Sequence, residues 1–98
     1  MKASELAAKA AELVGGDRAS QHGDKVQNHQ CIADVWNGYL KARRTAGKPD
    51  ELTAEDVANL MECLKIARRQ TGGFNPDDYV DGAGYAACAG EIRARSSA

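Results

Sequence analysis

Four charged residues at helical spacing are the first candidates for chemistry in this sequence. Asp78 and Asp81 are three apart in NPDDYVDGAGY, and Lys65 and Arg68 are three apart in LKIARR. Side chains at this spacing project from the same face of a helix. Two carboxylates on one face repel unless a cation lies between them, and Mg²⁺ binds through one or two carboxylates plus substrate phosphates. The two bases are candidates to hold those phosphates.

The same charges also have a structural explanation. Asp77 and Asp78 would lie in the first turn of a helix, where the helix dipole stabilises negative charge. Asp81 would pair with a base of the preceding helix. Spacing alone favours this explanation over a metal site. Arg69 is expected to face solvent, and Glu62 is a minor candidate for a metal ligand.

A second polar cluster, QHGDKVQN, leads into a helix. Asp24 is a good N-cap, because its carboxylate can accept hydrogen bonds from the first free backbone N–H groups. His22 is a candidate donor to a ligand phosphate or base, or else a loop cap, and Asn28 lies on the first turn. We expect this entry point to face a pocket formed by the two later helices. The sequence contains no catalytic triad at readable spacing and no phosphate-binding glycine loop.

Composition excludes several classes of function. The net charge of −1 gives no electrostatic basis for binding nucleic acid or a membrane surface. No apolar run approaches the roughly 20 residues needed to cross a bilayer. The first segment, MKASELAAKAAELV, carries Glu5 and Glu12 and is typical of an amphipathic helix, not of a signal peptide. Three separated cysteines without a C-x-x-C pattern predict buried thiols in a reducing cytosol.

Four helices must position the polar residues. Apolar residues recur at helical spacing, and no segment alternates like a strand. Thr53 and Asn75 are N-cap candidates, and glycine pairs at 15–16 and 72–73 are stop signals. The sequence predicts a single all-α domain over residues 1–98, with helices at about 4–14, 25–44, 54–70 and 76–95.

Small residues dominate the expected core. Gly82, Gly84 and Gly90 fall inside the last helix, where each costs about 1 kcal/mol relative to alanine. Tight backbone packing is the usual reason for tolerating that cost. Because a helix lined with small residues permits close approach of a neighbour from the same or another chain, we expect an oligomer.

Three segments carry a resemblance: GDRASQHGDKVQNHQCIADVWNGYL, LTAEDVANLMECLKIARRQTG and NPDDYVDGAGYAACAGEI. Their ordered elements are GDR, HGDK with a following Asn and Trp, K-I-A-R, and D-x-x-D-x-x-G-Y. Together they resemble a family of small, mostly phage-encoded proteins of unassigned function. That family is similar to the nucleotide-modification-associated domains of phages, and to the all-α MazG-like nucleoside triphosphate pyrophosphohydrolases.

The resemblance implies a MazG-like four-helix bundle, usually oligomeric, that cleaves a nucleoside triphosphate with Mg²⁺ in the cytoplasm of an infected bacterial host. Asp78 and Asp81 match the acidic pair and would be catalytic and hold the metal. The nucleotide would be bound by residues of the matching motifs, namely His22, Asp24, Asn28, Lys65, Arg68 and Tyr85.

The sequence departs from the pyrophosphohydrolases in one respect. Those enzymes carry a Glu-x-x-Glu pair on an earlier helix, where this chain offers only Asp34 and, before it, Asp24. Two-metal hydrolysis needs a carboxylate cluster that holds ions roughly 4 Å apart. Two alternatives therefore stay open: a non-catalytic nucleotide-binding phage protein with a sequestering or anti-defence role, and a plain protein-interaction module.

Overall fold

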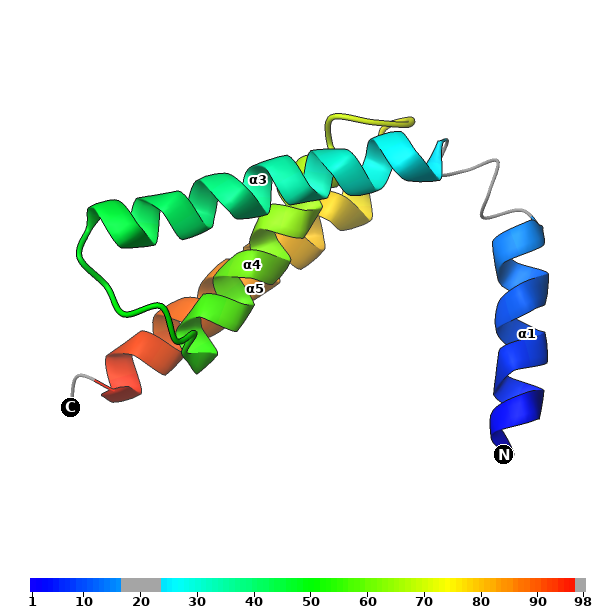
Figure 1. Ribbon diagram of the computed structural model, residues 1–98, viewed down its shortest axis with the longest axis horizontal. Helices are drawn as coiled ribbons and strands as arrows, with labels where there is room; N and C mark the ends of the chain where they lie inside the picture. The colour runs from blue at the N-terminus through cyan, green and yellow to red at the C-terminus, as the bar shows by residue number, and fades with distance from the viewer. Residues whose placement is uncertain (17–23, 97–98) are drawn as a thin grey trace.

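A computed structural model describes residues 1–16 and 24–96 of the chain. Over these ranges the protein is all-α without a strand, as predicted. The described residues form four helices, labelled in Figure 1: α1 (Ala3–Gly15), α3 (Lys25–Thr45), α4 (Ala54–Arg68) and α5 (Pro76–Ser96).

Local capping chemistry sets where the helices begin. At α3, the Asp24 side chain accepts hydrogen bonds from the backbone N–H groups of Val26 and Gln27. At α4, Thr53 and Asp56 form a reciprocal capping box, which satisfies two N–H groups that have no partner inside the helix. α4 ends at Arg68, slightly before the predicted position, and Gly72 follows in the turn with a φ of 70°.

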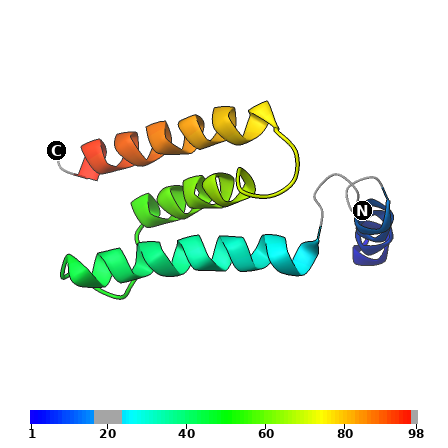
Figure 2. The ribbon, with the colours of Figure 1, turned by 90° about the horizontal axis from the view of Figure 1, so that it is seen from above.

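The helices form an open layer and not a closed bundle within one chain. α4 lies between α3 and α5 and packs against both, while α3 and α5 make no contact with each other. Figure 2 shows the three helices side by side. α1 packs against none of them and stands beyond the end of the layer. The arrangement of a single chain therefore differs from the expected four-helix bundle.

Small and polar residues fill the seams of this layer. Among the described residues no large side chain is completely buried, and the buried apolar positions are Ala58, Ala67 and Ala89. Trp36 joins α3 to α4 by donating from Nε1 to the carbonyl oxygen of Leu60, at 2.8 Å. The few large apolar residues seen in the sequence are thus spread along the layer and do not meet in one centre.

α1 is amphipathic and exposed along its whole length. Leu6, Ala10, Leu13 and Val14 share one side, as their spacing predicted. No helix of the described chain is long and apolar enough to cross a membrane.

Candidate functional site

The seam between α4 and α5 brings together two of the predicted site residues. Lys65 of α4 and Asp81 of α5 form an ion pair, with 3.0 Å between Nζ and Oδ2. The Lys65 side chain is only 12% exposed, while that of Asp81 is 47% exposed. The helices therefore bury the stem of the lysine and leave one side of the carboxylate open to solvent.

Asp78 lies one turn before Asp81, where α5 begins, and is buried. Its backbone carbonyl accepts a hydrogen bond of 3.1 Å from Nη2 of Arg69. The two carboxylates of the predicted acidic pair thus differ in environment. Asp78 is enclosed at the start of the seam, and Asp81 is the one that a ligand in solvent can approach.

Arg69 does not face solvent as expected. Its guanidinium carbon lies 4.3 Å from the centre of the Tyr79 ring, and its Nε is buried without a hydrogen-bond partner. A Cβ added at Gly82 would lie 2.5 Å from Nη2 of Arg69. The glycine therefore makes room for a guanidinium that lies across α5, which is the close packing that the sequence indicated at this position.

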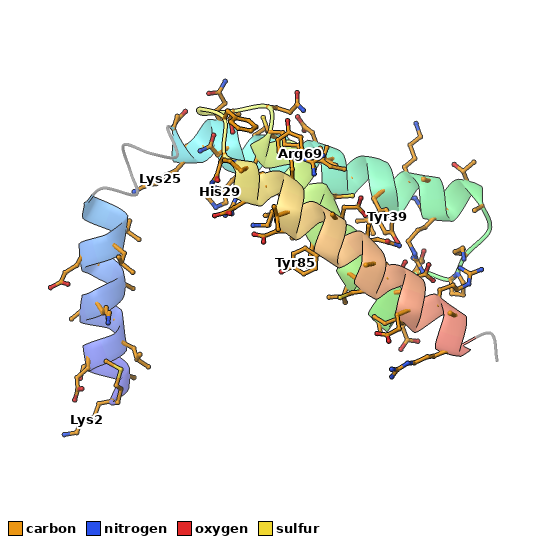
Figure 3. All side chains as sticks on the ribbon, turned by 180° about the vertical axis from the view of Figure 1, so that it is seen from behind. Lys2, Lys25, His29, Tyr39, Arg69 and Tyr85 are labelled. Carbon is orange, nitrogen blue, oxygen red and sulfur yellow. The ribbon has the colours of Figure 1, made fainter. Side chains whose placement is uncertain are left out.

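Arg68 and Tyr85 complete the predicted α4–α5 set. Arg68 is exposed, and it has no ion-pair partner in the part of the chain that the structure describes. Tyr85 lies one turn after Asp81 and is half-buried. Figure 3 shows Tyr85 projecting from α5 away from α3.

The entry motif is not brought to this seam. Asp24 is the N-cap of α3, which confirms the capping interpretation. Asn28 is half-buried on the first turns of the same helix, and His22 lies outside the described residues. Because α4 lies between α3 and α5, one chain does not unite Asp24 and Asn28 with Asp81.

The donor set of the seam fits a metal that arrives with its ligand. Within residues 1–16 and 24–96, no three His, Cys, Asp or Glu side chains gather closely enough to hold an ion. Mg²⁺ commonly binds through one or two carboxylates and completes its coordination with water and substrate phosphates. Asp81 could supply the protein's share of such a set, whereas Asp78 is buried.

A polar network between α3 and α4 was not predicted from the sequence. Asp56 accepts hydrogen bonds from the Tyr39 hydroxyl at 2.6 Å and from Nε of Arg43 at 2.9 Å. It also accepts from the backbone N–H and the hydroxyl of Thr53, and Asn59 donates to the Tyr39 oxygen. The available signals were the capping box and the i, i+4 spacing of Tyr39 and Arg43.

The environment of Asp56 stabilises its charge. Burial acts to raise the pKa of Asp56, but the hydrogen bonds from Tyr39 and Thr53 and the charge of Arg43 outweigh it and lower the pKa from 3.8 to about 2. Burial and the neighbouring carboxylate raise the pKa of Tyr39. Asp56 is therefore a fixed anion that joins two helices, not a proton donor at neutral pH.

A hollow of about 260 Å³ adjoins this network. Arg43, Lys48, Glu51, Asp56 and Arg93 are among its lining residues, and a hollow of about 240 Å³ shares most of them. Neither includes Lys65 or Asp81. The charges that line the first hollow are largely paired, because Asp56 binds Arg43 and Arg93 binds Glu55. This hollow therefore shows no excess of positive or negative charge.

The cysteines of the described chain are free thiols, and only part of the prediction for them holds. Cys31 and Cys63 are half-buried, but Cys88 is exposed on α5. The apolar stripe of this helix is narrow, because small residues and not large ones pack against α4, and Cys88 falls beyond it.

Comparison with known proteins places this chain in a family. Residues 5–93 match the model of a domain of unknown function, DUF6378. The chain belongs to this family. A relative named Gene 55 protein, from Mycobacterium phage L5, is 43% identical over 77 residues, which cover 79% of this chain and 45% of the relative. A second Gene 55 protein, from Mycobacterium phage D29, is 37% identical over 84 residues, covering 86% of this chain and 50% of that protein.

These findings confirm the predicted family of small phage-encoded proteins. The chain spans about half the length of the curated relatives that it matches. No solved structure matches. The likeness to MazG-like enzymes stays a prediction.

Proposed function

We propose that this phage protein binds the Mg²⁺ complex of a nucleoside polyphosphate at the α4–α5 seam. The Lys65–Asp81 ion pair is the contact that the structural explanation of these charges predicted; the observation that supports the proposal is its exposure, because the carboxylate is half-exposed while the lysine is nearly buried. The pair carries no net charge. A phosphate oxygen could replace Asp81 as the partner of Lys65. The metal that accompanies the phosphate would then bind the Asp81 carboxylate, so that both Lys65 and Asp81 keep a partner of opposite charge.

The neighbouring residues support the same chemistry. Arg68 lies three residues after Lys65, is exposed, and is positioned to bind a second phosphate. Tyr85 follows Asp81 by four residues and offers an aromatic ring on the same side of α5. Mg²⁺, when bound, would neutralise phosphate charge and fix its orientation. Such ligands are abundant in the cytoplasm of an infected cell, where we expect the protein to act.

Hydrolysis is a further step, which the resemblance implies. It would cleave the triphosphate to the monophosphate and pyrophosphate by attack of water. The described carboxylates of one chain form no cluster able to hold two ions. Binding is therefore the function that the geometry of a single chain supports best, and turnover is an outcome for the experiment to decide.

Calorimetric titration of the chain with each common nucleoside triphosphate, with and without Mg²⁺, tests binding. Lys65→Met should weaken affinity by about tenfold or more, because a charge-assisted hydrogen bond contributes about 1.5–3 kcal/mol. Asp81→Asn should remove the dependence on Mg²⁺. Asp77→Asn is the matched control, because Asp77 lies on the first turn of α5, is exposed and forms no ion pair with a residue of the described ranges. If none of the nucleotides binds, the proposal is refuted. Chromatography for released pyrophosphate would show whether a bound nucleotide is also hydrolysed.

A protein-interaction role is a second candidate, favoured by a different observation. Val57 on α4 is exposed although it lies in the middle helix of the layer, and the apolar side of α1 contacts nothing in the described chain. Apolar surface left open in this way marks interaction sites in soluble proteins.

A further inference from the structure

One side of α4 carries apolar residues that the other described helices leave exposed or only half-buried. Asp56 and Leu60 bond to α3, and Lys65 pairs with α5. Because successive residues of a helix are turned by about 100°, a third side of α4 remains, away from both neighbours. That side holds Val57, which is 55% exposed, and Met61 and Leu64, which are half-buried.

α5 extends this apolar side. Tyr85 and Ile92 follow Asp81 by four and eleven residues and therefore lie on the same side of α5. The ion pair from Lys65 to Asp81 joins that side of α5 to the side of α4 that carries Met61. We name the combined surface the open face; it consists of Val57, Met61, Leu64 and Ile92, while Tyr85 is left to the ligand of the proposed function.

The apolar stripe of α1 is the natural complement of the open face. Leu6, Leu13 and Val14 are exposed and touch no other helix. α1 has 13 residues and α4 has 15, so at a rise of about 1.5 Å per residue they are about 20 and 22 Å long. In Figure 3, α1 extends below the layer, on the side where Tyr85 is drawn.

The chain exposes more surface than a compact monomer of its mass. Its accessible surface is 7138 Å², whereas a folded monomer of 10.4 kDa exposes about 5,400 Å². The radius of gyration is 16.2 Å, against about 13 Å for a compact domain of this length. The excess of about 1,700 Å² is larger than the roughly 800 Å² that each partner contributes to a standard protein interface.

We propose that the occupant of the open face is α1 of a second copy of this chain. The two copies exchange their first helices about a two-fold axis, so that each α1 packs its Leu6, Leu13 and Val14 side on the open face of the partner. Such an exchange uses the same two surfaces twice and closes the assembly at two copies. It also covers both unpartnered apolar surfaces of each chain at once.

Sedimentation equilibrium of the full chain tests the exchange. The wild type at about 100 µM should have twice the 10.4 kDa mass of one chain. The double variant Leu6→Glu, Leu13→Glu and the single variant Val57→Glu should each raise the dimer dissociation constant by about tenfold or more, because each buries a carboxylate against apolar side chains. Ala8→Glu on the opposite side of α1 and Ala86→Glu on an exposed part of α5 are the controls and should remain dimeric.

Mixing the variants distinguishes exchange from other arrangements. A chain with an altered α1 still has an intact open face, and a Val57→Glu chain still has an intact α1. An equimolar mixture of the two should therefore recover dimers through one unaltered contact. The α1 variant cannot unfold the layer, because α1 contacts no other helix, and circular dichroism checks the helix content of both.

Three results would overturn the proposal. One is a wild type that stays monomeric, as it would if α1 folded back on its own chain or if the open face served a different protein. Another is a dimer unaffected by the α1 double variant, which would mean that the open faces pack on each other directly. The third is a mixture of variants that remains monomeric.

Discussion

Replacing Asp56 by asparagine tests whether the polar network holds α3 to α4. The substitution keeps the size of the side chain but removes the charge that faces Arg43, and the two side chains are each only 8% exposed. It also replaces one acceptor oxygen by an NH₂ group, so the hydrogen bonds from Tyr39 and Thr53 can no longer all be made.

The expected loss is large for a chain of this size. Removing one member of a buried ion pair costs about 3–5 kcal/mol, because the remaining charge stays buried without its partner. The lower end applies here, since the amide still accepts one hydrogen bond. A loss of about 3 kcal/mol is a substantial part of the total stability of about 5–15 kcal/mol that is usual for a domain, and it corresponds to a fall of about 12 °C or more in the melting temperature.

Thermal and urea unfolding followed by circular dichroism would measure this loss. The control is Glu91→Gln, which breaks the exposed pair with Arg95 and should change stability by less than about 0.5 kcal/mol. If Asp56→Asn lowers the free energy of unfolding by less than about 1 kcal/mol, the carboxylate and its hydrogen bonds do not hold α3 to α4.

Three further predictions concern stability. Folding lowers the pKa of Asp56 from 3.8 to about 2. The carboxylate therefore contributes about 2 kcal/mol to the free energy of unfolding above about pH 4, and this contribution is lost as the pH falls towards 2. Urea titrations across this pH range should show the loss in the wild type and not in Asp56→Asn. Gly84→Ala should stabilise α5 by up to about 1 kcal/mol, since its Cβ meets open space. Gly82→Ala should be less stable than Gly84→Ala by about 1 kcal/mol, because its Cβ displaces the Arg69 guanidinium; equal melting temperatures for these two variants would contradict the role assigned to Gly82.

Helix boundaries were predictable because their causes are local. Asp24 bonds to N–H groups two and three residues ahead, and Thr53 does the same with the residue three ahead. Asn75 likewise accepts from the N–H of Asp77, with Pro76 at the first position of α5. Each of these interactions is contained in a window of four residues, so residue types alone identify it.

The seams were less predictable, because they depend on which helices pack together and in what register. Lys65 and Asp81 were singled out as opposite charges, and the structure pairs them. Arg69 and Arg43 gave no such signal, because a basic residue near the end of a helix is also typical of a solvated surface. Their buried positions follow from contacts with Asp78, Tyr79 and Asp56, at separations of 9 to 13 residues and across a turn or a loop.

The two sides of α4 that are in contact are held by different means. Toward α3 the contact is polar and directional, through the Asp56 carboxylate and the Leu60 carbonyl. Toward α5 it depends on small residues that let the helix backbones approach, with Ala58, on the Lys65 side of α4, and Gly82 both buried. Apart from Trp36, the side chains named in these two contacts are small or polar. Val57 is left 55% exposed and Met61 and Leu64 are only half-buried, so the sparse core of the single chain and its open face have the same cause.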